Sequence, residues 1–126
     1  MIFGVGVDIV KIARFEKWAK NPALIERFFN ERERLPLGAK ERRFSEHYAA
    51  RFAAKEAFSK ALGTGLCGFA LSEVWIENKE SGEPKIVLSG NAQKKVVEKA
   101  GSGANVFVSL SHEKEFAVAF VVIERQ

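Results

Sequence analysis

We expect an α+β fold for this chain of 126 residues, with a small antiparallel sheet packed against helices. Three observations support this fold class. β-branched residues alternate with small or polar ones over residues 3–10, and two β-rich runs joined by a short polar stretch lie over residues 104–124, as in a hairpin. The segments between them repeat their apolar residues at helical spacing. The length suits one domain, so residues 1–126 are expected to fold as a single unit.

The composition narrows the class of protein. A single cysteine, Cys67, forms no internal disulfide, and two histidines are a poor inventory for a structural zinc site. No stretch approaches the ~20 apolar residues of a membrane span, so we expect no signal, no membrane anchor and a cytoplasmic protein. The net charge of +4 favours an acidic partner, which leaves nucleic acid, a membrane surface, an anionic metabolite and an acidic protein open.

The first strand, FGVGVDIV, places Asp8 on the same face as two glycines, Gly4 and Gly6. Positions without side chains allow another group to approach closely. The opposite face is apolar and carries Phe3, Val5, Val7 and Ile9. Alternatively, Asp8 ends the strand and caps the next helix.

Residues 10–20 show a helical pattern with Ile12, Phe15 and Ala19 on one stripe. A different side gathers Lys11, Arg14, Lys17 and Trp18. A solvated basic face explains such a run, and the added Trp18 favours a docking surface for an acidic partner. A second short helix is expected after it, with Asn21 as its cap and Pro22 at its first position.

The central segment, RFAAKEAFSKALGTG, belongs to a helix that we expect to begin at Ser45 as N-cap. One side of this helix is smooth, since it carries only the alanines Ala50, Ala53, Ala54, Ala57 and Ala61. Glu56 lies on a second side among aromatic residues. It either forms a surface pair with Lys60 or is a buried charge that needs a partner or a metal. The burial expected for this helix favours the second interpretation, without identifying the ligand.

Glycines follow this helix, and Gly63 suits the left-handed residue past its end. The loop is no P-loop, because it follows a helix C-terminus, where the helix dipole is negative. A bound anion would need a cation such as Lys60, and a plain turn is the alternative. Residues 70–79 and 85–88 read as strands, residues 90–100 as a helix, and the last strand, FAVAFVVI, is either central in its sheet or part of a subunit interface.

Three stretches, GVGVDIVKIARFEK, RFAAKEAFSKALGTG and VSLSHEKEFAVAFVVIE, together resemble the holo-acyl-carrier-protein synthase family of small trimeric phosphopantetheinyl transferases. The resemblance spans almost the whole chain and implies the 4'-phosphopantetheinyl transferase fold in one subunit of a homotrimer with sites at the interfaces. It implies transfer of 4'-phosphopantetheine from coenzyme A to a serine of apo-acyl carrier protein, in support of fatty acid biosynthesis. The other product is adenosine 3',5'-bisphosphate.

By the same resemblance, Asp8 and Glu56 ligate magnesium, or manganese in its place, and Lys60 contacts the phosphates. These three residues form the expected catalytic set. Magnesium suits one or two carboxylates, waters and substrate phosphates. A metal-bound water, Asp8 and Glu56 all remain open as the group that takes the serine proton.

The resemblance also assigns residues to the two substrates. It implies a coenzyme A site that includes, besides Lys60, the residues Arg51, Gly63, Thr64, Gly65, Pro84 and His112. It implies a carrier-protein surface made of Lys11, Arg14, Lys17 and Lys20. Because acyl carrier proteins are strongly acidic, this surface explains the positive charge without nucleic acid or a membrane.

Two positions depart from the family pattern. Asn30 stands where threonine is common, which puts the support of the neighbouring Glu33 in question, and Glu83 precedes Pro84 where a basic residue is frequent. Two other functions compete with the transferase. One is a non-catalytic binder of acidic proteins or nucleic acid that uses the basic helix alone, and the other is a transferase for a different coenzyme A substrate.

Overall fold

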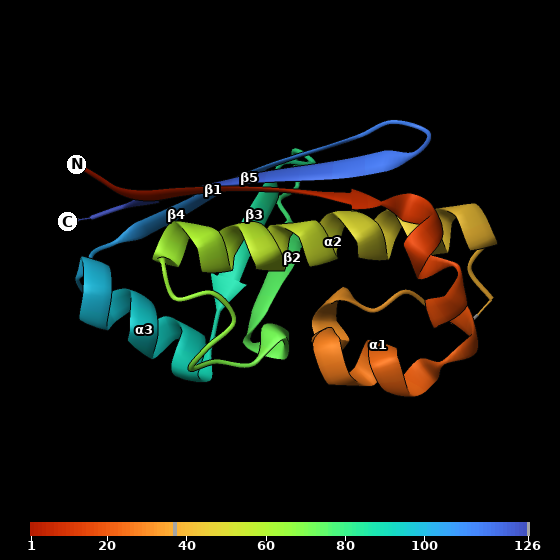
Figure 1. Ribbon diagram of the computed structural model, residues 1–126, viewed down its shortest axis with the longest axis horizontal. Helices are drawn as coiled ribbons and strands as arrows, with labels where there is room; N and C mark the ends of the chain where they lie inside the picture. The colour runs from red at the N-terminus through yellow and green to blue at the C-terminus, as the bar shows by residue number, and fades with distance from the viewer. Residues whose placement is uncertain (37, 126) are drawn as a thin grey trace.

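The structure is a computed structural model that describes residues 1–36 and 38–125 (Figure 1). The strands are β1 (Ile2–Lys11), β2 (Val74–Asn78), β3 (Pro84–Leu88), β4 (Asn105–His112) and β5 (Phe116–Glu124). The helices are α1 (Pro22–Phe28), α2 (Glu41–Leu62) and α3 (Gly90–Ala100). Short 3₁₀ turns connect them, namely η1 (Ile12–Phe15), η2 (Lys17–Lys20), η3 (Glu31–Glu33) and η4 (Leu71–Glu73).

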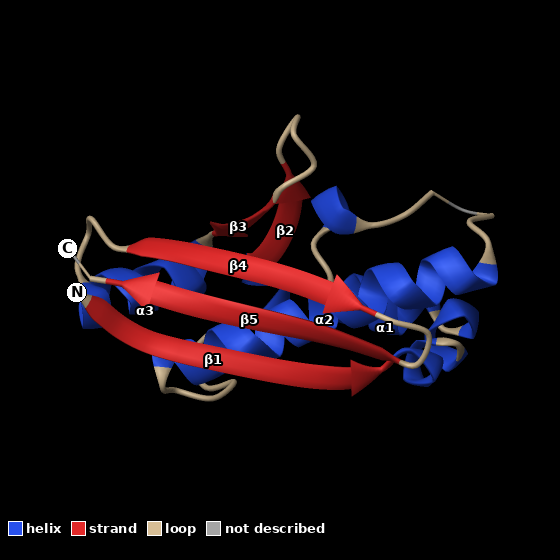
Figure 2. Cartoon of the chain, turned by 90° about the horizontal axis from the view of Figure 1, so that it is seen from above, coloured by secondary structure: helices blue, strands red, loops and turns tan. Residues whose placement is uncertain are grey.

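The strands form two antiparallel sheets. The larger sheet has the order β1-β5-β4, and the smaller sheet pairs β2 with β3. The prediction of a C-terminal hairpin is therefore confirmed, and its last strand is the central strand of the sheet. The helices all lie on one side of the larger sheet, and Figure 2 shows its other face without a covering element.

Backbone atoms of β1 and α2 are in direct contact. A Cβ atom built on Gly4 would lie 1.9 Å from the carbonyl oxygen of Ala61, and one on Gly6 would lie 1.9 Å from that of Ala57. Only glycine permits this approach. The group that approaches the glycine face of β1 is therefore the alanine side of α2, and this contact brings Asp8, on the same face of β1, to the surface of α2.

The central helix begins earlier than its sequence suggests. It starts at Glu41, and Ser45 lies one turn inside it, 2% exposed, with an Oγ atom that has no hydrogen-bond partner among the described residues. The prediction of Ser45 as N-cap is wrong, because this helix has no side-chain cap at Lys40 and Ser45 is part of the buried face instead. Its end is as predicted, with Gly63 in the left-handed conformation at φ 82°.

The prediction of one helix over residues 10–20 is also wrong. β1 continues to Lys11, and the two short turns η1 and η2 follow. Trp18 packs in an aromatic cluster, with its ring centroid 4.8 Å from that of Phe15 and 5.9 Å from that of Phe52. This packing explains the aromatic residue on the basic side. Asn21 makes no side-chain cap, although Pro22 does begin α1 as predicted.

The uncovered face of the larger sheet exposes large apolar side chains. They are Val5 (50%), Val7 (51%), Ile9 (61%), Phe107 (53%) and Phe120 (43%). Directly paired residues share a face, and the register joins Val7 to Phe120 in this patch. Within residues 1–36 and 38–125, no helix has the length and apolar character needed to cross a bilayer.

Candidate functional site

The site centres on Asp8, which lies within β1 opposite Ala119 and faces α2. Asp8 is three residues from the end of its strand, so the alternative in which it caps the next helix is wrong. The ammonium group of Lys60 donates hydrogen bonds to Oδ1 of Asp8 at 3.1 Å and to the carbonyl oxygen of Val7 at 3.0 Å. Lys60 thus joins the last turn of α2 to the middle of β1.

Glu56 lies one turn before Lys60 on α2 and is half-buried. Burial raises the pKa of the Glu56 carboxyl, and the negative charge of Asp8 raises it further. The positive charges of Lys60 and Arg14 oppose this rise. Asp8, Glu56 and Lys60 therefore act on one another as a group, and the ion pair of Lys60 is with Asp8 instead of Glu56.

The donor set fits a hard divalent cation that keeps several waters. Asp8 and Glu56 supply carboxylate oxygens from two different elements, and no third His, Cys, Asp or Glu joins them among the described residues. Magnesium needs only one or two carboxylates and takes its other ligands from water and substrate phosphates. The arrangement does not suit zinc, which prefers a complete set of nitrogen and sulfur ligands.

The glycine loop begins directly after the turn that carries Lys60. Gly63 and Gly65 have positive φ angles of 82° and 62°, and a Cβ atom on either would meet open space. The hydroxyl of Thr64 donates to the carbonyl oxygen of Gly65 at 2.9 Å. The loop is thus folded by its own atoms, and the Cβ positions of its two glycines face open space.

The other residues predicted to bind coenzyme A are not gathered around Asp8 within the chain. His112 ends β4. Because β5 lies between β4 and β1, the backbones of β4 and β1 are about 10 Å apart. Pro84 begins β3 in the smaller sheet. Most of Arg51 is buried, its guanidinium donates to the carbonyl oxygen of His47 at 3.5 Å, and its Nε atom is buried without a partner among the described residues.

The residues predicted to face a carrier protein are all exposed, namely Lys11, Arg14, Lys17 and Lys20. The guanidinium carbon of Arg14 lies 5.0 Å from the ring centroid of Phe52 on α2, a cation–π contact that orients the side chain. Arg14 is also close enough to Glu56 to lower the pKa of its carboxyl. The basic surface therefore borders the site directly.

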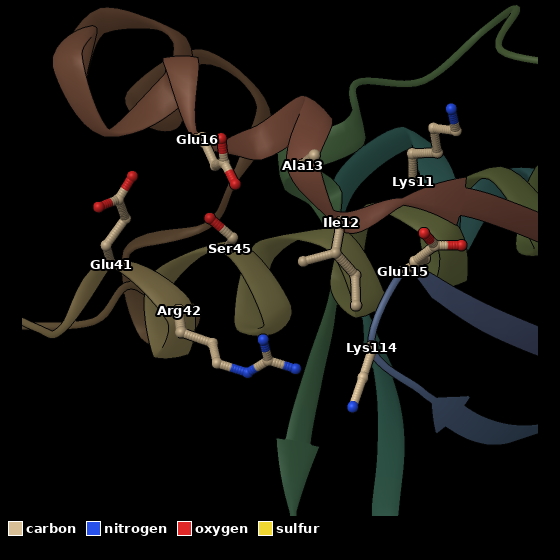
Figure 3. A pocket seen from close by; sticks show the side chains of 9 residues that line it. All are labelled: Lys11, Ile12, Ala13, Glu16, Glu41, Arg42, Ser45, Lys114 and Glu115. Carbon is tan, nitrogen blue, oxygen red and sulfur yellow. The ribbon is translucent and has the colours of Figure 1, made fainter.

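A hollow of about 550 Å³ lies beyond the end of β1, between the first turns of α2 and the tip of the β4–β5 hairpin (Figure 3). Its charged lining is balanced, since it contains Lys11, Arg42 and Lys114 together with Glu16, Glu41 and Glu115. Except for Lys11, the sequence did not mark these residues. Because its charges cancel, the hollow does not add a positive field to the site.

The sequence also missed a fully buried ion pair behind the site. The Lys55 ammonium lies 2.5 Å from Oε1 of Glu33, and the two side chains are 1% and 0% exposed. Burial lowers the pKa of Lys55, and Glu33 opposes that shift. Lys55 directly precedes Glu56 in the stretch RFAAKEAFSKALGTG, but a lysine is expected at the surface when only the sequence is known.

Asn30, the first departure from the family pattern, contacts Glu33 through its backbone. Its backbone N–H donates to Oε1 of Glu33 at 3.0 Å, and its side-chain oxygen accepts from the Arg32 N–H at 2.9 Å. Its amide nitrogen donates to the carbonyl oxygen of Ser72 at 3.1 Å. Glu83, the second departure, forms an exposed ion pair with Lys79 at 3.2 Å in the β2–β3 turn.

Comparison with known proteins agrees with this geometry. A family model described as the 4'-phosphopantetheinyl transferase superfamily matches residues 4–121. The holo-[acyl-carrier-protein] synthase of Treponema denticola is 46% identical over 124 residues, which cover 98% of this chain and 99% of that protein.

Solved structures show the same likeness. The holo-(acyl-carrier-protein) synthase of Bacillus anthracis in complex with CoA (3',5'-ADP) has 39% identity and a TM-score of 0.81, over 100% of this chain and 99% of that chain. The Helicobacter pylori holo-[acyl-carrier-protein] synthase in complex with coenzyme A has 33% identity and a TM-score of 0.77, over 95% and 99%. The expected α+β fold with small antiparallel sheets is therefore confirmed.

Proposed function

Because the chain belongs to the 4'-phosphopantetheinyl transferase superfamily, we propose that it is a holo-acyl-carrier-protein synthase. It transfers the 4'-phosphopantetheine group of coenzyme A to a serine hydroxyl of apo-acyl carrier protein, which gives the holo-protein and adenosine 3',5'-bisphosphate. The observation that carries the proposal is the convergence of Asp8, Glu56 and Lys60 beside an open glycine loop. We further propose that the enzyme acts in the cytoplasm and that it supports fatty acid biosynthesis.

Asp8 and Glu56 would hold a magnesium ion, or manganese in its place, and the ion would neutralise the diphosphate of coenzyme A. Lys60 holds positive charge next to these carboxylates, where it can contact the phosphates and stabilise the charge on the leaving bisphosphate. A metal-bound water, Asp8 and Glu56 are the candidates for the group that takes the serine proton.

The arrangement of the remaining residues supports binding between subunits. Arg51, Pro84 and His112 are proposed to bind coenzyme A together with Gly63, Thr64 and Gly65. Since His112 and Pro84 lie on elements apart from Asp8, the complete site is proposed to take contributions from neighbouring copies. The uncovered apolar face of the larger sheet supports a homotrimer that buries it.

The carrier protein is proposed to bind at the exposed basic surface of Lys11, Arg14, Lys17 and Lys20. This surface borders Glu56 through Arg14, so a serine on a bound acidic protein would lie near the carboxylates. Opposite charges there favour rapid and specific association. Neither nucleic acid nor a membrane is needed to explain the charge.

The proposal is tested by mass spectrometry of apo-acyl carrier proteins incubated with coenzyme A and magnesium. We expect the mass of one phosphopantetheine to be gained, and we expect Glu56→Ala to abolish the gain while the fold is retained. No gain across several carrier proteins would refute the proposal. Salt-sensitive binding that survives loss of both carboxylates, without transfer, would indicate a non-catalytic binder instead.

A further inference from the structure

The buried pair of Lys55 and Glu33 lies away from any surface that a substrate reaches. Both side chains are essentially inaccessible, at 1% and 0% exposure. Taking two charges out of water is costly, and a buried ion pair often stabilises a protein no more than apolar residues of the same size would. We therefore look for the role of the Lys55–Glu33 pair in the structural elements that it connects.

The pair joins three elements that are far apart in the sequence. Lys55 belongs to α2, while Glu33 belongs to η3. The Lys55 ammonium also donates to the carbonyl oxygens of Leu71, at 3.0 Å, and Val74, which lie at the entry to β2. The second oxygen of Glu33 accepts from the backbone N–H of Ile76 within β2 at 3.4 Å. Both members of the pair thus bind the start of the β2–β3 hairpin.

This hairpin depends on such attachments more than the other strands do. It forms a sheet of its own that shares no ladder with β1, β5 or β4. In Figure 2 its turn projects away from the larger sheet. The buried side chains of Val74, Ile76 and Ile86 anchor its base by packing, which is less directional than hydrogen bonds to charged groups.

We propose that Lys55 and Glu33 are positioning residues that hold the β2–β3 hairpin, and with it Pro84, at a set place relative to the catalytic turn of α2. Lys55 directly precedes Glu56, so the attachment point of the hairpin and the catalytic carboxylate are on the same helical turn. This inference rests on the proposed function, in which the hairpin contributes to the coenzyme A site. The pair therefore governs the affinity for coenzyme A without touching it.

The test compares two variants with the wild-type protein. Glu33→Gln keeps the shape of the side chain and removes its charge, while Lys55→Met with Glu33→Leu replaces the whole pair by apolar groups that can fold well. We expect hydrogen exchange over residues 74–78 and 84–88 to become about tenfold faster in each, with exchange over residues 50–60 unchanged. Calorimetry should show coenzyme A bound about tenfold more weakly, and the kcat of transfer should stay within about twofold.

Lys95→Met with Glu98→Gln is the matched control, since it removes a surface ion pair on α3. It should leave both the hairpin exchange and the coenzyme A affinity unchanged. Wild-type exchange in the folded double variant would overturn the inference, as would faster exchange with unaltered affinity for coenzyme A. Hydrogen exchange and calorimetry do not need turnover. An absence of transfer by the wild-type protein would therefore refute the proposed function separately.

Discussion

The ammonium nitrogen of Lys60 lies 3.1 Å from Oδ1 of Asp8, so the predicted phosphate-binding lysine also neutralises a predicted metal ligand. The Lys60 side chain is 54% exposed, and such a pair adds little to stability. Lys60→Met should therefore lower kcat by about 100-fold or more while the midpoint of thermal unfolding changes little. Lys99→Met on α3 is the control, and transfer by Lys60→Met at wild-type rates would exclude the role.

Arg14 is expected to act on the carrier protein. Arg14→Glu reverses the charge at an exposed position that borders Glu56, so the KM for apo-acyl carrier protein should rise about tenfold or more at low salt. The difference from the wild-type protein should shrink as salt is added, because the attraction is screened. Steady-state kinetics at two salt concentrations measure this, with Lys99→Glu as the control. An unchanged KM would place the carrier protein elsewhere.

Gly6 should tolerate no side chain. The Cβ atom of Gly6→Ala would lie 1.9 Å from the carbonyl oxygen of Ala57, and backbone atoms cannot move aside cheaply. We expect a loss of about 3 kcal/mol or more in the free energy of unfolding by urea. Gly38→Ala, where a Cβ atom meets open space but φ is 87°, should cost only about 1 kcal/mol. Equal losses in both variants would contradict the close contact.

The raised pKa of Glu56 predicts the pH dependence of stability in the metal-free protein. The folded state binds the Glu56 proton more tightly than the unfolded state, so the ionised carboxylate destabilises the fold above its unfolded pKa. Glu56→Gln should therefore unfold at a higher temperature than the wild-type protein at neutral pH. Below both pKa values the carboxyl is neutral in either state and the difference should vanish. Thermal unfolding across this range, in chelator, provides the measurement.

His47 should affect the pH dependence of stability in the direction opposite to Glu56, since it should destabilise the fold as the pH falls. Burial and the neighbouring Arg51 lower the pKa of His47 to about 4, and its ring nitrogen Nε2 donates to the carbonyl oxygen of Glu33 at 2.6 Å. The unfolded state takes up the proton first as the pH falls, so stability from this residue is lost between about pH 6.5 and 4. His47→Gln should show a shallower decline over that interval in urea unfolding. A decline as steep as that of the wild-type protein would argue against His47 as its source.

Residue periodicity predicted most of the fold, including the starts of α1 and α3, but not the start of α2. Strand alternation and the hairpin at residues 104–124 follow from local patterns, and the structure has both. Ser45 looks like an N-cap because serine is a good capping residue, yet it lies on the buried face of a helix that begins at Glu41. Tertiary packing overrides local preference there. Likewise, residues 12–20 carry a helical pattern but form two tight turns that fit Phe15 and Trp18 into the aromatic cluster.

The candidate site was predictable where a motif marks it and not where only burial does. Asp8, Glu56 and Lys60 fall within recognisable stretches, and the structure brings all three together. The pairing of Lys55 with Glu33 joins residues 22 positions apart, and no local pattern indicates which lysine of a helix will be buried. The place of Arg51 beside Glu33 depends on the same long-range packing.

The contact of β1 with α2 through Gly4 and Gly6 also makes the position of the site less dependent on the size of core side chains. Only peptide atoms separate strand from helix at these positions, so van der Waals radii, instead of side-chain volumes, set the spacing between the backbones that carry Asp8 and Glu56. A change of side-chain volume elsewhere on α2, such as at Phe58, therefore does not act directly on that spacing.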